Sequence, residues 1–221
     1  MKILIIEDEK SLADSMVKYL QNEDYICEVA PDTQLAREKL ALFDYDCILL
    51  DIMLPKGSGL DLLQEIKAAK KMDGVIIISA KNSLEDRIFS LKLGADDYLS
   101  KPFHLAELSA RIQSIIRRRN FEGNNIIQHG DLMVDLNLKI VKVQNKEIEL
   151  TKSERALLIF LLHNKGKVID KSAIAEHLSG QSAMYFDNFD IIYTHIKNLK
   201  KKLGDAGDYI KTVYGTGYKL V

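Results

Sequence analysis

The first 119 residues alternate short apolar runs with amphipathic stretches, and this alternation restricts the fold more than any other feature. The apolar runs are near-continuous and rich in branched residues, as expected for strands that are buried on both faces of a sheet. The runs are KILII (2–6), CILLD (47–51), GVIIIS (74–79), the shorter DYLS (97–100), and a weaker YICEVA (25–30) that suits an edge strand. Five strands that alternate with helices predict right-handed βαβ units and a doubly wound parallel sheet.

Between these runs, apolar residues recur at the spacing of one helix face, and each stripe predicts an amphipathic helix. The fourth stripe is followed by Gly94, a residue type that commonly ends a helix. The five stripes are Leu12, Met16, Val17 and Leu20; Leu35, Ala36 and Leu40; Leu62, Leu63 and Ile66; Leu84, Ile88 and Leu91; and Leu105, Leu108, Ile112 and Ile115.

The pattern changes at RRRNFEGNN (117–125), a charged and turn-rich segment that we interpret as a short linker. We therefore expect one domain over residues 1–119, a linker over 120–125 and a second domain over 126–221. Segment 138–151 predicts an antiparallel hairpin around Gln144–Lys146.

The second predicted domain continues with helices and ends in strands. Thr151 and Glu154 have the spacing of a capping box, and the helix that they open closes near Gly166. Three helices and a terminal hairpin predict a small α+β winged helix-turn-helix domain. The helices are expected over 152–161, about 171–178 and about 188–203, and the two strands over 209–221, around the turn Tyr214–Gly217.

Charge and cysteine usage restrict the class of protein. Residues 1–119 carry 17 Lys/Arg and 20 Asp/Glu, a net charge of −3, and residues 120–221 carry 14 and 12, a net charge of +2. The two cysteines, Cys27 and Cys47, lack the CxxC spacing and suit a reducing compartment, where we expect both as small core residues. No apolar run approaches the ~20 residues of a membrane span, and the start has no signal-peptide pattern, so we expect a cytoplasmic protein.

Charged side chains collect at one predicted edge of the first domain. In an open parallel sheet, ligands bind at the carboxyl ends of the strands. Glu7 and Asp8 follow the first strand, Asp51 ends the third, Ser79 ends the fourth and Lys101 follows the fifth.

Three neighbouring carboxylates repel one another unless a cation neutralises them. Hard oxygen ligands favour magnesium. A carboxylate beside magnesium and a lysine can attack a phosphoryl group in line and form an acyl phosphate. The metal and Lys101 would then offset charge on the phosphoryl oxygens, and Ser79 would donate a hydrogen bond to one of them.

The first domain resembles the receiver domain of bacterial two-component response regulators. The resemblance rests on IEDE (6–9), LLDIMLPKGSGLDL (49–62), ISA (78–80) and GADDYLSKPF (94–103), with Ser79 where the family more often has Thr. It implies that Asp51 is the phosphoacceptor and that Ser79 and Tyr98 form a switch pair. It also implies that Lys101 binds the phosphoryl group and precedes a cis Pro102. The implied magnesium ligands are Glu7, Asp8, Asp51 and the backbone carbonyl of Met53.

The third helix of the second domain has one apolar and one basic face. Ile192, Ile196, Leu199 and Leu203 fall on one side, directed at the core. A helix with a Lys/Asn/Thr face, second in a helix-turn-helix, fits the DNA major groove, and a following wing could reach the adjacent backbone. The candidate DNA-binding residues are Thr194, Lys197, Asn198, Lys200, Lys201 and Lys202 of the helix and Lys211, Thr212 and Tyr214 of the wing.

This second domain resembles the winged-helix effector of OmpR/PhoB-type response regulators. The motifs are LTKSERALL (150–158), HIKNLKKKLG (195–204) and IKTVYGTGYKL (210–220), with Asn198 and Lys200 where the family usually has Arg. We expect the aromatic residues Tyr185, Phe186 and Phe189 to lie in the core.

The resemblance also implies a mode of action and a set of partners. A sensor histidine kinase would phosphorylate the chain, which would dimerise and bind double-stranded promoter DNA, with RNA polymerase as a further partner. The dimer would use the fourth helix, fifth strand and fifth helix, with intermolecular ion pairs Arg87–Glu107 and Asp97–Arg111. Catalysis would be confined to the chain's own phosphorylation and dephosphorylation.

Three other interpretations compete with a phosphorylation-controlled transcription factor. A phosphoester hydrolase would need a second acid two residues after Asp51, where Met53 stands. A dinucleotide-binding protein would need a GxGxxG after the first strand, which is absent from the sequence. A DNA-binding regulator that works independently of phosphorylation stays open, and comparing the DNA footprint of Asp51→Asn with that of the unmodified protein would distinguish it.

Overall fold

The structure is a computed structural model that describes residues 1–55, 57–69, 73–81, 83–121, 123–179 and 190–221. It divides into two compact units, Lys2–Arg119 and Asn120–Val221. Within the described residues, no helix is both long and apolar enough to cross a membrane. The expected core residues Tyr185, Phe186 and Phe189 lie outside the described residues.

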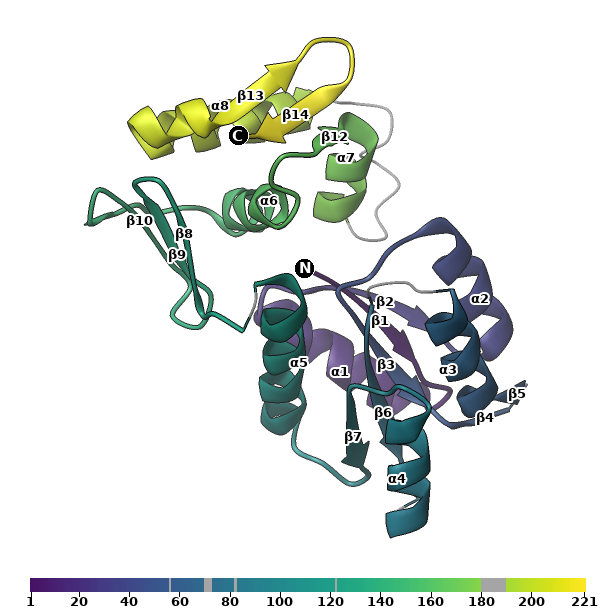
Figure 1. Cartoon of the computed structure of the whole chain (residues 1–221). Helices are drawn as coiled ribbons and strands as arrows, with labels where there is room; N and C mark the ends of the chain where they lie inside the picture. Colours follow the sequence, from purple (N-terminus) through teal and green to yellow (C-terminus); the bar gives the residue numbers. More distant parts are fainter. Residues whose placement is uncertain (56, 70–72, 82, 122, 180–189) are drawn as a thin grey trace. The chain divides into compact units, whose positions relative to one another are not determined.

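A five-stranded parallel sheet forms the centre of the first unit, as predicted (Figure 1). The strand order is β2-β1-β3-β6-β7, with β2 at one edge. This order places the ends of β1 and β3 side by side, where the strand order reverses and ligands of doubly wound sheets bind. The strands are β1 (Lys2–Ile6), β2 (Ile26–Ala30), β3 (Cys47–Asp51), β6 (Gly74–Ser79) and β7 (Asp97–Ser100).

Among the described residues, helices α1 to α4 connect the strands of this sheet, and α5 follows the last strand. Helices α1 and α5 cover one face, and α2 and α3 cover the other (Figure 1). The strands are buried on both faces because each lies between these layers, which explains their near-continuous apolar sequence. The helices are α1 (Lys10–Asn22), α2 (Thr33–Leu42), α3 (Gly59–Ala68), α4 (Leu84–Lys92) and α5 (Leu105–Asn120).

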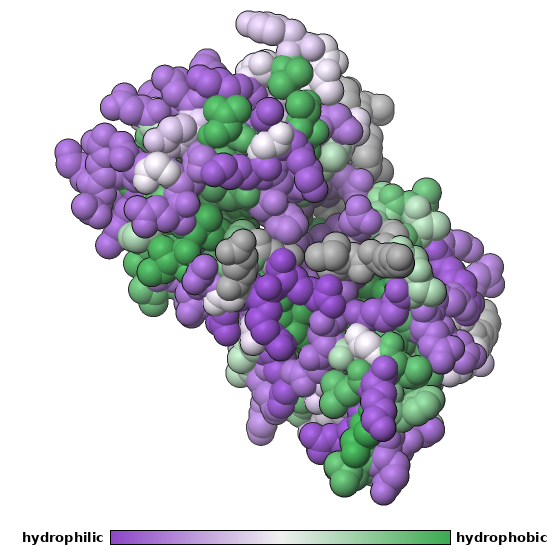
Figure 2. Space-filling view, viewed as in Figure 1, coloured by the Kyte–Doolittle hydropathy of each residue, from purple (hydrophilic) through white to green (hydrophobic). Residues whose placement is uncertain are grey.

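Helix α4 exists where predicted, and its apolar stripe is largely exposed to solvent. Leu84, Ile88 and Leu91 are 65%, 42% and 46% exposed, and Ser90 is the buried residue of this helix. The periodicity identified an apolar face correctly, yet α4 packs beside β7 through the side that carries Ser90. Figure 2 shows apolar side chains at the surface in the region of α4.

The second unit begins with an antiparallel sheet of four strands, ordered β11-β10-β9-β8. The predicted hairpin is present as β10 and β11, and its turn residues Gln144 and Asn145 have φ values of 50° and 65°. The two strands before it were not predicted from the sequence. The strands are β8 (Ile126–His129), β9 (Leu132–Asp135), β10 (Ile140–Val143) and β11 (Lys146–Glu147).

In the part of this unit that the structure describes, three α-helices, a 3₁₀ helix and a second antiparallel sheet follow. The predicted capping box is confirmed, since Thr151 accepts from the amide of Glu154 while the Glu154 carboxylate accepts from the amide of Thr151. The terminal hairpin is also confirmed, and β12 adds a third strand in the order β12-β14-β13. The elements are α6 (Lys152–His163), β12 (Val168–Asp170), α7 (Lys171–Ser179), α8 (Asp190–Leu203), the 3₁₀ helix η2 (Gly204–Tyr209), β13 (Ile210–Val213) and β14 (Gly217–Leu220).

Candidate functional site

Three carboxylates converge at the carboxyl edge of the parallel sheet, as the sequence predicted. One oxygen from each of Glu7, Asp8 and Asp51 lies within 4.8 Å of the others. Glu7 and Asp51 are buried, whereas Asp8 is exposed. Strands β1 and β3 are neighbours in the sheet, so Glu7 and Asp51, which are 44 positions apart in the chain, meet at this edge.

Lys101 follows β7 and reaches across this edge to the carboxylates. Its Nζ atom lies 2.6 Å from Oδ2 of Asp51 and 3.0 Å from Oε1 of Glu7. Burial alone would lower the pKa of Lys101, but its hydrogen bonds to Asp51 and Glu7 outweigh burial and raise the pKa. Lys101 therefore stays charged beside the two buried carboxylates. The peptide bond that joins it to Pro102 is cis, as the resemblance implied.

The negative charge of Glu7 is only partly compensated by Lys101. Burial raises the pKa of Glu7, the hydrogen bond from Lys101 opposes the rise, and the nearby charge of Asp51 adds to it. Its Oε2 atom lies 2.9 Å from Lys101 Nζ, but it has no hydrogen-bond partner of suitable geometry among the described residues. A buried oxygen of this kind, within a set of three carboxylates, fits a hard divalent cation such as Mg²⁺.

Asp51 itself is held in place by backbone and side-chain contacts. Its Oδ1 atom accepts a hydrogen bond of 2.8 Å from the amide of Met53, whose side chain is exposed. Gly59, the first residue of α3, packs against this strand end so closely that a Cβ there would lie 2.3 Å from the Asp51 carbonyl oxygen. The role of Gly59 was not predicted, although its position eight residues after the buried acid is visible in the sequence.

Ser79 and Tyr98 lie behind the carboxylate edge on the neighbouring strands β6 and β7. Both residues are buried, and the Ser79 hydroxyl accepts a hydrogen bond of 3.1 Å from the amide of Lys81. The Tyr98 hydroxyl donates to the carbonyl of the same Lys81, at 2.5 Å. Burial raises the pKa of Tyr98, and a hydrogen bond with Ser79 opposes the rise. The tyrosine ring is therefore turned inward in this structure.

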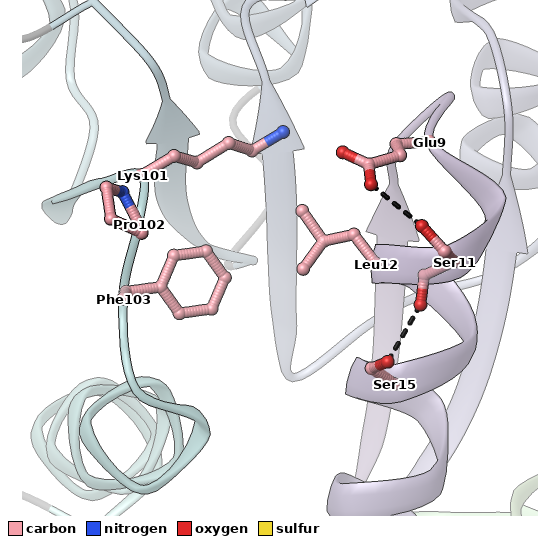
Figure 3. A pocket seen from close by; sticks show the side chains of 7 residues that line it. All are labelled: Glu9, Ser11, Leu12, Ser15, Lys101, Pro102 and Phe103. Carbon is pink, nitrogen blue, oxygen red and sulfur yellow. Dashed lines mark hydrogen bonds between the residues drawn. The ribbon is translucent and has the colours of Figure 1, made fainter.

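A cleft of ≈ 530 Å³ adjoins the site between the start of α1 and the loop that joins β7 to α5 (Figure 3). Lys101 reaches toward it from one side, and Glu9 with Ser11 stands on the other. Of the lining residues, Lys101 was predicted as a site residue, and Glu9 belongs to the acidic run that includes Glu7. The lining residues are Glu9, Ser11, Leu12, Ser15, Lys101, Pro102 and Phe103.

The predicted dimer residues are already engaged within one chain. Arg111 lies 2.6 Å from Asp97 and 2.7 Å from Glu107 of its own chain. The guanidinium of Arg87 lies 6.0 Å from the centre of the Tyr98 ring. Intermolecular pairing of these side chains stays a prediction.

The amphipathic helix α8 has the two faces that the sequence suggested. Its apolar residues Ile192, Ile196, Leu199 and Leu203 are buried in the core of the second unit. Exposed positions on the opposite side include Thr194, Lys197, Asn198 and Lys201. These exposed side chains are accessible to a binding partner.

Lys200 and Lys202 differ from the other candidate DNA-binding lysines. Lys200 is half-buried, and Lys202 donates a hydrogen bond of 2.7 Å to the buried carboxylate of Glu154. Burial would raise the pKa of Glu154, but the contacts with Lys202 and Thr151 lower it below its usual value. Lys202 is thus tied to the start of α6.

The wing residues lie on β13 and on the turn that follows it. Lys211 and Thr212 are exposed, and Tyr214 is 93% exposed. The turn continues through Gly215, whose φ of +77° suits glycine. These side chains are exposed to solvent and are therefore accessible to a binding partner.

Two family descriptions match the chain: residues 3–113 match "Response regulator receiver domain" and residues 145–220 match "Transcriptional regulatory protein, C terminal". The chain is 34% identical over 220 residues to the transcriptional regulatory protein QseB of Escherichia coli O157:H7, covering 100% of this chain and 99% of that protein. It is 37% identical over 226 residues to the cell cycle response regulator CtrA of Brucella anthropi, covering 100% and 95%.

Among solved structures, the crystal structure of DrrB, an OmpR/PhoB homolog from Thermotoga maritima, has a TM-score of 0.50 and 27% identity, covering 100% of this chain and 98% of that one. The comparisons therefore extend over both units. They confirm the resemblance that the sequence motifs suggested in each half.

Proposed function

Because the chain belongs to the two-component response regulators of the OmpR/PhoB type, it is a phosphorylation-controlled transcriptional regulator, and we propose that Asp51 accepts the phosphoryl group. The observation that carries this proposal is the contact of 2.6 Å between Asp51 and Lys101, beside two further carboxylates. The donor is proposed to be a sensor histidine kinase.

In the proposed reaction, one oxygen of Asp51 forms a bond to phosphorus while the bond from phosphorus to the donor histidine breaks. The Lys101 ammonium would move from its carboxylate partners to the phosphoryl oxygens and offset their charge. Glu7, Asp8, Asp51 and the carbonyl of Met53 would hold Mg²⁺, which would supply further charge neutralisation when bound. The donor histidine retains the electron pair of the broken bond.

We propose that Ser79 and Tyr98 transmit phosphorylation to the rest of the chain. The Ser79 hydroxyl would donate a hydrogen bond to a phosphoryl oxygen, and the inward position of Tyr98 would be favoured. A shift of two states from 1:99 to 99:1 requires ~5.5 kcal/mol of differential stabilisation. Dimerisation is proposed to supply part of it, through Arg87 with Glu107 and Asp97 with Arg111 of the second chain. The Asp97–Arg111 ion pair within one chain would be replaced by an Asp97–Arg111 ion pair between the two chains.

In the second unit, we propose that helix α8 enters the major groove of promoter DNA and the wing contacts the adjacent backbone. Lys202 contributes less than its neighbours because Glu154 already neutralises it. The proposed contacts are Thr194, Lys197, Asn198, Lys200 and Lys201 of α8, and Lys211, Thr212 and Tyr214 of the wing. The protein would act in the cytoplasm, with RNA polymerase as a further partner.

The experiment that tests this proposal compares DNA binding with and without acetyl phosphate and Mg²⁺. Binding to promoter DNA should strengthen on phosphorylation in the unmodified protein and stay unchanged in Asp51→Asn. Equal binding in all four samples would favour a regulator that works independently of phosphorylation.

A further inference from the structure

A lysine–tyrosine pair joins the two helices of the helix-turn-helix. Lys171 is the first residue of α7, and Tyr193 lies in the first turn of α8. Nζ of Lys171 donates a hydrogen bond to the Tyr193 hydroxyl and lies 4.9 Å from the centre of its ring. Tyr193 is 44% exposed, so the pair stands at the surface of the unit. Neither residue was predicted from the sequence to have a role.

The chemistry of this pair suits an anion. The hydroxyl oxygen of Tyr193 accepts from the ammonium, so its own proton points elsewhere and is available for an acceptor. Contact with the ring and the hydroxyl also restricts the Lys171 side chain before any ligand arrives, which reduces the entropy cost of binding. The pair therefore presents a positive charge and a hydroxyl donor close together.

The acidic residue directly before Lys171 caps the start of α7. Asp170 precedes Lys171, but its carboxylate accepts a hydrogen bond of 2.7 Å from the amide of Ala173 at the start of α7. On the inner side, Tyr193 is close enough to the buried Tyr218 of β14 to contribute to the raised pKa of that residue, after burial. Tyr193 therefore lies near the small sheet and is still 44% exposed.

The position of the pair relates it to the proposed DNA-binding face. Thr194 follows Tyr193 directly, and Lys197 lies one turn further along the exposed side of α8. In helix-turn-helix complexes, the second helix enters the major groove by its N-terminal residues while the first helix crosses the sugar–phosphate backbone. The Lys171–Tyr193 pair links the start of α7 to the first turn of α8. It therefore lies between the residues expected to contact the major groove and those expected to contact the sugar–phosphate backbone.

We propose that Lys171 and Tyr193 together bind one phosphate of the DNA backbone, with the ammonium and the hydroxyl both donating to its oxygens. This inference rests on the proposed DNA-binding function of the second unit and adds a site to it. Phosphate contacts fix the register and affinity of a protein on the duplex but carry no base preference. The pair therefore strengthens binding to every sequence alike.

The test measures binding of the full-length protein to fluorescent duplexes of several sequences over a range of salt concentrations. Lys171→Gln should weaken binding and reduce the magnitude of the log–log salt slope by about 0.9, the value for one phosphate contact. Tyr193→Phe, which keeps the ring, should weaken binding about 2- to 10-fold with the slope unchanged, as for one lost hydrogen bond. The matched control, Lys146→Gln on the exposed strand β11, should bind like the unmodified protein.

Three outcomes would overturn the inference. One is a Lys171→Gln slope equal to that of Lys146→Gln while Lys197→Ala with Lys201→Ala weakens binding, which leaves the proposed function standing. Another is a Tyr193→Phe variant that changes the ranking of the duplexes, since that would make Tyr193 a base-reading residue. The third is an unmodified protein that binds no duplex, which would contradict the proposed function itself. Thermal unfolding of each variant verifies that its fold is intact.

Discussion

Replacing Lys101 by methionine should destabilise the first unit strongly. The change removes a cation that lies 2.6 Å from Asp51 and 3.0 Å from Glu7, both of which are buried. A hydrogen bond to a charged group contributes about 1.5–3 kcal/mol, and breaking a buried ion pair costs about 3–5 kcal/mol. Because the Lys101 side chain is 19% exposed, water compensates part of the loss, so we expect the free energy of unfolding to fall by about 3 kcal/mol.

The loss should also depend on pH. The pKa of Glu7 in the folded protein is raised above its ordinary value of 4.5, so between these two values the folded state holds more protons than the unfolded state. Stability therefore falls as pH rises through this window. Since Lys101 opposes the rise in the pKa, its removal should extend the window upward and make the fall steeper.

Hydrogen exchange of the Cys47–Asp51 amides in the full-length protein, followed by mass spectrometry of the peptides, measures this opening free energy. Lys92→Met is a matched control, because Lys92 is exposed at the end of α4, and it should change stability by less than about 0.5 kcal/mol. Adding Mg²⁺ should restore part of the stability of Lys101→Met. Equal exchange in the two variants at pH 7.5 would show that Lys101 does not stabilise the first unit.

Three further predictions concern other parts of the chain. Glu154→Gln should lower the unfolding free energy of the second unit by about 1–3 kcal/mol in urea titrations, whereas the exposed control Glu147→Gln should be nearly neutral. The pKa of Glu154 is lowered in the folded state. Its contribution to stability is therefore fully present above the unfolded-state pKa and is lost as pH falls through the folded-state pKa. Gly217→Ala should disrupt the terminal sheet in circular dichroism, since a Cβ would lie 1.9 Å from a backbone oxygen, whereas Gly215→Ala meets nothing within 4 Å and should cost only about 1 kcal/mol of left-handed strain. Cys47, whose thiol pKa is raised by burial, should react with a maleimide only after unfolding, as read by intact mass.

The architecture could be predicted where sequence periodicity and burial agree. The strands of the parallel sheet are buried on both faces, so their apolar runs were unambiguous. Helix α4 shows the limit of this reasoning, because the periodicity of Leu84, Ile88 and Leu91 gives an apolar face without saying whether it meets the sheet. Strands β8, β9 and β12 were not predicted, although β7 and β10, which are about as short, were.

The sequence predicted those parts of the site that depend only on the order of the strands in the sheet. Glu7, Asp8, Asp51 and Lys101 were expected together because the carboxyl ends of neighbouring strands share an edge, and the structure places them there. Contacts that depend on side-chain direction were not accessible in this way. The binding of Lys202 to Glu154, 48 residues earlier, requires the packed positions of α6 and α8.

The central claim is that Asp51 is the residue that becomes phosphorylated. Incubation of the full-length protein with acetyl phosphate and Mg²⁺, followed by intact mass spectrometry, tests it most directly. We expect a gain of one phosphoryl group that is absent in Asp51→Asn and is lost when Mg²⁺ is chelated beforehand. An unmodified protein that gains no mass, or an Asp51→Asn variant that gains it equally, would contradict the account.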